Sequence, residues 1–121
     1  MVETTKRVVA VIDDLFFMAK VKDAAVAAGM GIVFAKSKDD AVVQCSAAPC
    51  LAVIDLNAGK FSPIELVIQL KSLGVPMLGF LSHVNVELKA KAVEAGAGRV
   101  LARSALAQNI NAIFREFAQG K

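Results

Sequence analysis

The chain has 121 residues and a net charge of +3, with 56% hydrophobic and 21% charged residues, so we expect a single domain over residues 1–121 with one buried core. Its basic residues are scattered singly among acids, and it has no Trp or Tyr to stack a base, which argues against nucleic-acid binding by this domain alone. No apolar run is long enough to span a membrane, and the start of the chain lacks a signal-peptide pattern, which predicts a cytoplasmic protein without membrane contact.

Five short apolar runs alternate with helical patterns along the chain. In order, these runs are Val8–Ile12, Ile32–Ala35, Leu51–Ile54, Met77–Leu81 and Val100–Ala102. The first, third and fourth are apolar at consecutive positions, as expected for strands that are buried on both faces. Strict alternation of strand and helix predicts a parallel sheet with helices on both sides.

Capping residues mark where the intervening helices begin. The stretch Ser37–Asp40 has the pattern of a capping box and predicts the start of the second helix. Ser62 as N-cap, Pro63 at the first helical position and Glu65 in the first turn predict the start of the third.

Glycines and periodicity mark where the helices end and which side they bury. Gly29, Gly74 and Gly96 fall where the first, third and fourth helices should stop. The buried face of the last helix is predicted from helical spacing of apolar residues at Leu106, Ile110, Ile113 and Phe117.

These elements make a (βα)5 chain, for which we expect an α/β, doubly wound, three-layer fold. The common strand order for such a five-stranded parallel sheet is 2-1-3-4-5. The first and third strands are then neighbours, and ligands bind at the carboxyl ends of the strands where the chain reverses direction.

Three acidic residues follow these two strands. Asp13 and Asp14 come directly after the first strand, and Asp55 comes directly after the third. Carboxylates that converge in this way raise one another's pKa unless a cation neutralises them, and a hard divalent ion such as Mg²⁺ prefers oxygen ligands. The simpler alternative is that Asp13 and Asp14 only cap the first helix, which leaves Asp55 unexplained.

The fourth and fifth strands end at Ser82 and Arg103, on the far side of the same crevice. A carboxylate nucleophile, a metal, a hydroxyl group and a fixed cation are the parts that an aspartyl-phosphate site requires.

This constellation resembles the CheY-like receiver domains of two-component response regulators. The resemblance runs from Arg7 to Phe117 and rests on Val11-Ile12-Asp13-Asp14, Val53-Ile54-Asp55-Leu56-Asn57, Val75-Pro76-Met77, Ser82 and Glu94-Ala95-Gly96-Ala97. It implies the flavodoxin-like fold of that family.

The resemblance also implies roles for the site residues. Asp55 would be the phosphoacceptor. Asp14, Asp55 and the backbone carbonyl of Asn57 would bind Mg²⁺, with Asp13 acting through water. Ser82 takes the place of the family's switch Ser or Thr.

Four positions depart from the family pattern. Arg103 stands where the family has lysine, which keeps the charge but changes its shape. Ser104 replaces the proline that usually follows, so a cis peptide bond is not expected, and Ser104 should instead cap the last helix. His83 is bulkier than the usual residue, and Val100 replaces the aromatic residue that usually switches with the hydroxyl.

The leading hypothesis is a stand-alone receiver, not an enzyme, that a histidine kinase or phosphotransfer protein phosphorylates and that docks on a downstream target. The rival hypothesis is a pseudoreceiver, a phosphorylation-independent interaction module. A flavodoxin-like cofactor binder is disfavoured because acids occupy the first loop. An aspartyl-phosphate phosphohydrolase is disfavoured because Asn57 stands where that chemistry wants a second acid.

Two surfaces are candidates for contacts with partners. The run Leu15-Phe16-Phe17 opens the first helix, and its three side chains cannot all face the core. On the fourth helix, Val86, Ala90 and Val93 form a second apolar stripe, which would mark an interaction or homodimer face if it is exposed.

The two cysteines, Cys45 and Cys50, lack the spacing of zinc ligands, and one histidine cannot complete a site with them. We expect reduced thiols packed in the core.

Overall fold

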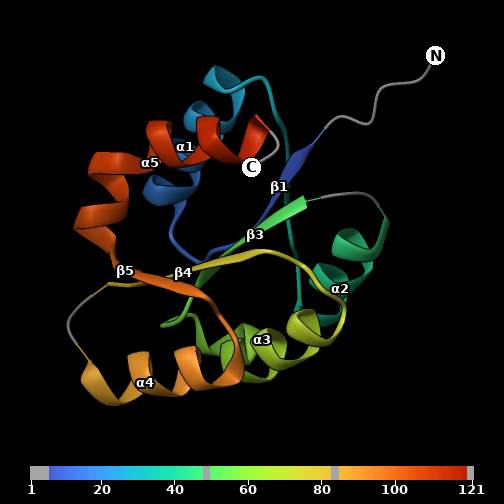
Figure 1. Ribbon diagram of the computed structural model, residues 1–121, viewed down its shortest axis with the longest axis vertical. Coiled ribbons are helices and arrows are strands. Elements are labelled where there is room, and N and C mark those ends of the chain that lie inside the picture. Colours follow the sequence, from blue (N-terminus) through green and yellow to red (C-terminus); the bar gives the residue numbers. More distant parts are fainter. Residues whose placement is uncertain (1–5, 48–49, 83–84, 120–121) are drawn as a thin grey trace.

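The structure is a computed structural model that describes residues 6–47, 50–82 and 85–119 (Figure 1). Its elements in chain order are β1 (Arg7–Val11), α1 (Leu15–Ala27), β2 (Gly31–Phe34), α2 (Lys38–Ala47), β3 (Cys50–Asp55), the 3-10 helix η1 (Gly59–Phe61), α3 (Pro63–Ser72), β4 (Met77–Leu81), α4 (Val86–Ala95), β5 (Arg99–Ala102) and α5 (Arg103–Ala118).

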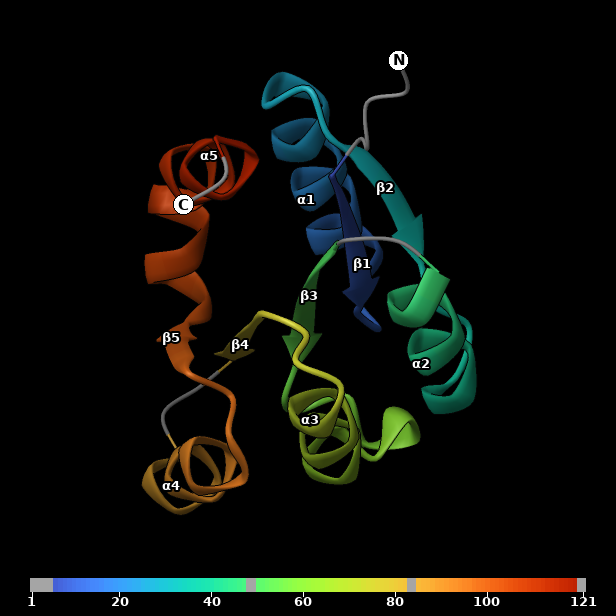
Figure 2. The same cartoon turned by 45° about the vertical axis from the view of Figure 1, so that its right-hand side comes forward.

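The five strands form one parallel sheet in the order β2-β1-β3-β4-β5, which confirms the predicted topology. Helices α1 and α5 cover one face, and α2, α3 and α4 cover the other (Figures 1 and 2). The chain leaves β1 for one face and β3 for the other. The carboxyl ends of these two neighbouring strands therefore border the crevice where the predicted acids lie.

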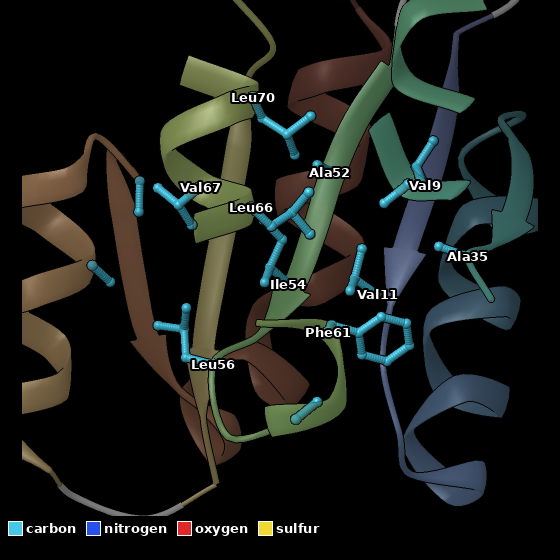
Figure 3. Packing of buried hydrophobic residues seen from close by; sticks show 14 of the residues in the cluster. Val9, Val11, Ala35, Ala52, Ile54, Leu56, Phe61, Leu66, Val67 and Leu70 are labelled. Carbon is cyan, nitrogen blue, oxygen red and sulfur yellow. The ribbon is translucent and has the colours of Figure 1, made fainter. Parts of the chain in front are cut away.

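Side chains alternate between the two faces of the sheet and build a core on each. On the face of α1 and α5, Phe17 packs against Phe80 with ring centroids 4.7 Å apart. On the opposite face, Leu66 and Leu70 of α3 pack toward Ile54 and Ala52 of β3 (Figure 3). Strand β3 is buried at every position, because helices cover it on both faces.

The capping box of α2 is confirmed with a small change of partner. The hydroxyl of Ser37 accepts a hydrogen bond from the Asp40 amide at 3.0 Å, and the Asp40 carboxylate accepts one from the Lys36 amide at 2.9 Å. Ser62 occupies the N-cap of α3 as predicted, but with a left-handed backbone (φ 47°) and no side-chain cap. Pro63 follows it in the first turn.

Helix ends largely follow the predicted signals. Gly29 and Gly74 follow the ends of α1 and α3, and Gly96 is the C-cap of α4. Gly96 has φ 111°, and a Cβ atom there would lie 2.7 Å from Cγ of Lys71.

The predicted cap of the last helix is wrong. Residue Ser104 lies inside the first turn of α5, because β5 runs directly into the helix and the extended backbone of Ala102 serves as N-cap without a side-chain bond. The buried face of α5 includes Leu106, Ile110 and Ile113 as predicted, together with Phe114, while Phe117 is half-buried. No cis peptide bond occurs among the described residues, in line with the loss of the proline.

Within residues 6–47, 50–82 and 85–119, no helix combines the length and apolarity needed to cross a bilayer.

Candidate functional site

The predicted acids lie at one edge of the sheet, at the carboxyl ends of β1 and β3. Asp13 and Asp14 follow β1 and precede α1, and Asp55 is the last residue of β3. These strands are hydrogen-bonded neighbours, with Val11 opposite Ile54. The sheet topology thus brings together acids that are about 40 residues apart in the sequence.

Asp55 is the one buried charged side chain in the described part of the chain, with 8% exposure. Its Oδ1 accepts a hydrogen bond from the backbone amide of Asn57 at 2.9 Å. Burial raises the pKa of the Asp55 carboxyl, the Asn57 hydrogen bond opposes this rise, and the negative charge of Asp13 adds to it. A positive charge close to this buried carboxylate would stabilise its ionised form.

Asp14 uses both of its oxygens within the protein. Oδ1 caps α1 by accepting hydrogen bonds from the amides of Phe16 at 2.9 Å and Phe17 at 3.3 Å. Oδ2 pairs with Nη2 of Arg103. The alternative role of Asp14, as the cap of the first helix, is therefore confirmed.

Arg103 is fixed by a second contact, since its guanidinium lies over the ring of Phe17, 5.0 Å from the centroid. Sequence analysis placed Arg103 at the crevice but did not identify either contact. The partners are separated by more than 80 residues, so no local pattern could have found them.

Asp13 is the most exposed of the three acids and lies 3.5 Å from the ammonium group of Lys60. Sequence analysis missed Lys60, which η1 brings to the pocket. Among the residues that the structure describes, no three His, Cys, Asp or Glu side chains lie close enough to hold a metal ion. In this structure, the basic side chains of Lys60 and Arg103 pair with Asp13 and Asp14.

Asn57 and Ser82 connect the ends of β3 and β4. The side-chain oxygen of Asn57 accepts hydrogen bonds from the Ser82 amide at 2.7 Å and from the Ser82 hydroxyl at 2.9 Å. The backbone carbonyl of Asn57, which the resemblance implies as a metal ligand, accepts a hydrogen bond from the Gly59 amide at 3.0 Å. The side chain of Asn57 thus has a positioning role that sequence analysis missed.

Val100 and His83 are two of the positions that depart from the family pattern. Val100 is buried on the face of α3 and α4. His83 lies outside the described residues.

The donors of this pocket suit a hard cation in their chemistry, because they are carboxylate and carbonyl oxygens around a buried acid with a raised pKa. In this structure, however, two of the acids are already paired with basic side chains, which would compete with a metal ion. Arg103 already neutralises Asp14 and Lys60 lies beside Asp13, so a divalent ion would have to replace the guanidinium at Asp14.

Comparison with solved structures shows the fold of CheY-like receiver domains over almost the whole chain. A receiver domain protein from Methanospirillum hungatei JF-1 is 18% identical, with a TM-score of 0.76 and coverage of 98% of this chain and 100% of that one. A response regulator from Thermotoga maritima is 16% identical, with a TM-score of 0.78 and the same coverage.

A response regulator from Burkholderia pseudomallei, whose structure contains a phosphorylated aspartic acid and a calcium ion, is 23% identical at a TM-score of 0.76. The match covers 95% of this chain and 69% of that one. No protein-family model matches the sequence, and no curated protein matches it.

Proposed function

We propose that this chain is a response-regulator receiver that accepts a phosphoryl group on Asp55. The observation that carries the proposal is the burial of Asp55 at the end of β3, where the crevice of a doubly wound sheet lies. A buried carboxylate is poorly solvated and is therefore a better nucleophile than a surface carboxylate. The receiver fold supports the same assignment.

In this proposal a carboxylate oxygen of Asp55 attacks the phosphorus of the donor, and the bond from phosphorus to the leaving group breaks. Asn57 holds Oδ1 of Asp55 through its amide and places the Ser82 hydroxyl at the pocket. For that hydroxyl to donate a hydrogen bond to the new phosphoryl group, its proton has to turn away from Oδ1 of Asn57, to which it is donated in this structure. Arg103 supplies positive charge to the phosphoryl oxygens.

Asp13, Asp14, Asp55 and the Asn57 carbonyl would hold Mg²⁺, which supplies charge neutralisation on the transferring oxygens when bound. For this to happen, the acidic side chains have to move closer together than they lie in this structure, and Arg103 has to leave Asp14 and turn toward the phosphoryl group. A cavity of about 610 Å³, lined by Phe17, Ser82 and Arg103 among others, lies beside the guanidinium and offers space for that movement.

The donor in this proposal is a histidine kinase or a phosphotransfer protein, and the signal passes to a downstream protein by docking. The start of α1 supports such contacts, because Leu15 and Phe16 are exposed beside the crevice. The chain would be a signalling protein and not an enzyme with turnover, at most catalysing phosphoryl transfer to its own Asp55.

Incubation with acetyl phosphate and Mg²⁺, followed by intact-mass measurement, tests the proposal. We expect one added phosphoryl group on the wild type, none on Asp55→Asn, and one on Asp23→Asn, which removes an exposed acid from α1. An adduct that persists in Asp55→Asn would contradict the assignment.

The alternative is a pseudoreceiver, and the ion pair between Arg103 and Asp14 is the observation that favours it. If this pair holds permanently, the site cannot assemble its cation and the fold serves as an interaction module. A folded wild type that gains no phosphoryl group at any Mg²⁺ concentration would support this alternative.

A further inference from the structure

Two thiols lie together at the edge of the sheet opposite the phosphoryl site. Cys45 is in the last turn of α2 and Cys50 is the first residue of β3, and both are free and buried, with exposures of 6% and 3%. The sulfur of Cys50 lies 4.0 Å from the carbonyl oxygen of Cys45, and the two thiols share a hydrogen bond. The two thiol groups are therefore neighbours at the junction of α2 and β3.

Asp55 and Cys50 are at opposite ends of β3. A strand of 6 residues that rises about 3.3 Å per residue separates them by about 16 Å. The thiol pair is thus independent of the proposed phosphoryl chemistry.

A guanidinium group lies beside the thiols. Arg7 is the register partner of Cys50 on the neighbouring strand β1. Its side chain donates hydrogen bonds to the backbone carbonyl and to Oε1 of Gln44, the residue before Cys45, which fixes the guanidinium at the end of α2. The Nε–H of Arg7 is buried and has no acceptor among the described residues. A thiolate on Cys50 would give this guanidinium a counter-charge.

The two thiols are unequal. The hydrogen bond from the Cys45 thiol lowers the pKa of Cys50; burial opposes this and the charge of Arg7 adds to it. The same hydrogen bond, together with burial, raises the pKa of Cys45. Cys50 is therefore the thiol that ionises first, and Cys45 keeps its proton.

We propose that Cys45 and Cys50 form a redox-active dithiol that a hydroperoxide oxidises to an intramolecular disulfide. The Cys50 thiolate attacks one peroxide oxygen, so that an S–O bond forms, the O–O bond breaks and the alkoxide or hydroxide leaves with a proton from solvent. The Cys45 sulfur then attacks the Cys50 sulfenic acid, the S–S bond forms, and the hydroxyl group leaves as water with the Cys45 proton. The two thiols lose two electrons and the peroxide gains them.

The thiol pair lies near the protein surface, because Ser46 and Ala47, directly after Cys45, are exposed. The disulfide would tie the last turn of α2 to the start of β3.

The test uses the full chain, fully reduced, with hydrogen peroxide as the probe. Intact mass and thiol titration should show the loss of two hydrogens and of both thiols in a monomer, reversed by dithiothreitol, while circular dichroism shows the folded protein throughout. Cys45→Ser should instead accumulate a sulfenic acid that dimedone traps, and Cys50→Ser should react far more slowly.

Arg7→Gln should slow oxidation about 3- to 10-fold, because it removes the charge beside the thiols. Arg99→Gln is the matched control, since it removes an arginine from the start of β5 at the far edge of the sheet and should leave the rate unchanged. Addition of oxygen without a disulfide, a disulfide only between chains, oxidation only after unfolding in urea, or equal rates for the two arginine variants would each overturn the proposal.

Discussion

Arg103 supplies positive charge to Asp14, and this contact decides how the pocket treats divalent cations. A partly exposed ion pair of this type contributes about 0.2–1 kcal/mol. Because Mg²⁺ has to displace the guanidinium, that free energy is subtracted from the binding of the metal.

Arg103→Gln should therefore bind Mg²⁺ about 1.5- to 5-fold more tightly than the wild type in isothermal titration calorimetry. Its phosphorylation by acetyl phosphate should nevertheless be slower, because the phosphoryl oxygens lose their cation. Arg99→Gln removes the same charge from the other end of β5 and controls for net charge. Equal Mg²⁺ affinities in the two variants would show that the ion pair does not compete with the metal.

The raised pKa of Asp55 means that the ionised carboxylate lowers the free energy of unfolding. Because burial raises this pKa in the folded chain, the unfolded chain releases the proton at lower pH, and stability falls as the pH rises above the ordinary value of 3.8. Asp55→Asn has no charge and keeps the oxygen that accepts the Asn57 hydrogen bond. Without Mg²⁺, it should melt a few degrees above the wild type at neutral pH, and the difference should close as the pH falls below 3.8.

Circular dichroism melts across this pH range give the measurement, with Asp23→Asn as the exposed control. A stabilisation of Asp55→Asn that stays constant at every pH would mean that repacking, and not charge, is responsible.

At the scale of the element, the first turn of α1 buries one of two neighbouring aromatic residues and exposes the other. Phe17 is 4% exposed and packs on Phe80, whereas Phe16 is 90% exposed. Phe17→Ala should destabilise the protein by about 3–5 kcal/mol, and Phe16→Ala should change its stability by less than about 0.5 kcal/mol.

The informative variant is Phe16→Ala. We expect it to accept phosphoryl groups from acetyl phosphate at the wild-type rate and more slowly from a phosphorylated histidine phosphotransfer protein, because only the second donor has to dock on α1. Equal transfer rates from the protein donor would show that Phe16 is not part of the docking surface.

At the scale of the whole molecule, the fold was predictable because its signals are local. Consecutive apolar residues mark β1, β3 and β4, and a regular alternation of elements leaves few possible topologies. The acids could be placed at one edge because strand order alone brings β1 and β3 together.

Contacts between distant side chains were not predictable in the same way. Whether Arg103 pairs with Asp14 or Asp55, and that Arg7 lies beside Cys50, depends on side-chain directions that no sequence spacing encodes. The start of α5 was misplaced for a related reason, because Ser104 is a good N-cap residue but the geometry of β5 already determines where the helix begins.

The predicted second stripe of α4 is exposed along its length, while Leu88, Ala92 and Ala95 of the same helix face the core. Val86 and Val93 therefore present apolar surface that a second copy of the chain could cover. In the proposed signalling cycle, phosphorylation of Asp55 beside Ser82 would change how this helix, the next element after β4, presents its surface.

We expect the wild type to self-associate more strongly after treatment with acetyl phosphate and Mg²⁺ than before it, as measured by sedimentation velocity over a range of concentrations. Val93→Lys should abolish this change, because a buried lysine at the interface is costly. Val43→Lys places the same charge on the exposed face of α2 and should leave self-association intact. If the lysine on α2 weakened association as much as the lysine on α4, the effect would come from net charge and not from a dimer built on the α4 stripe.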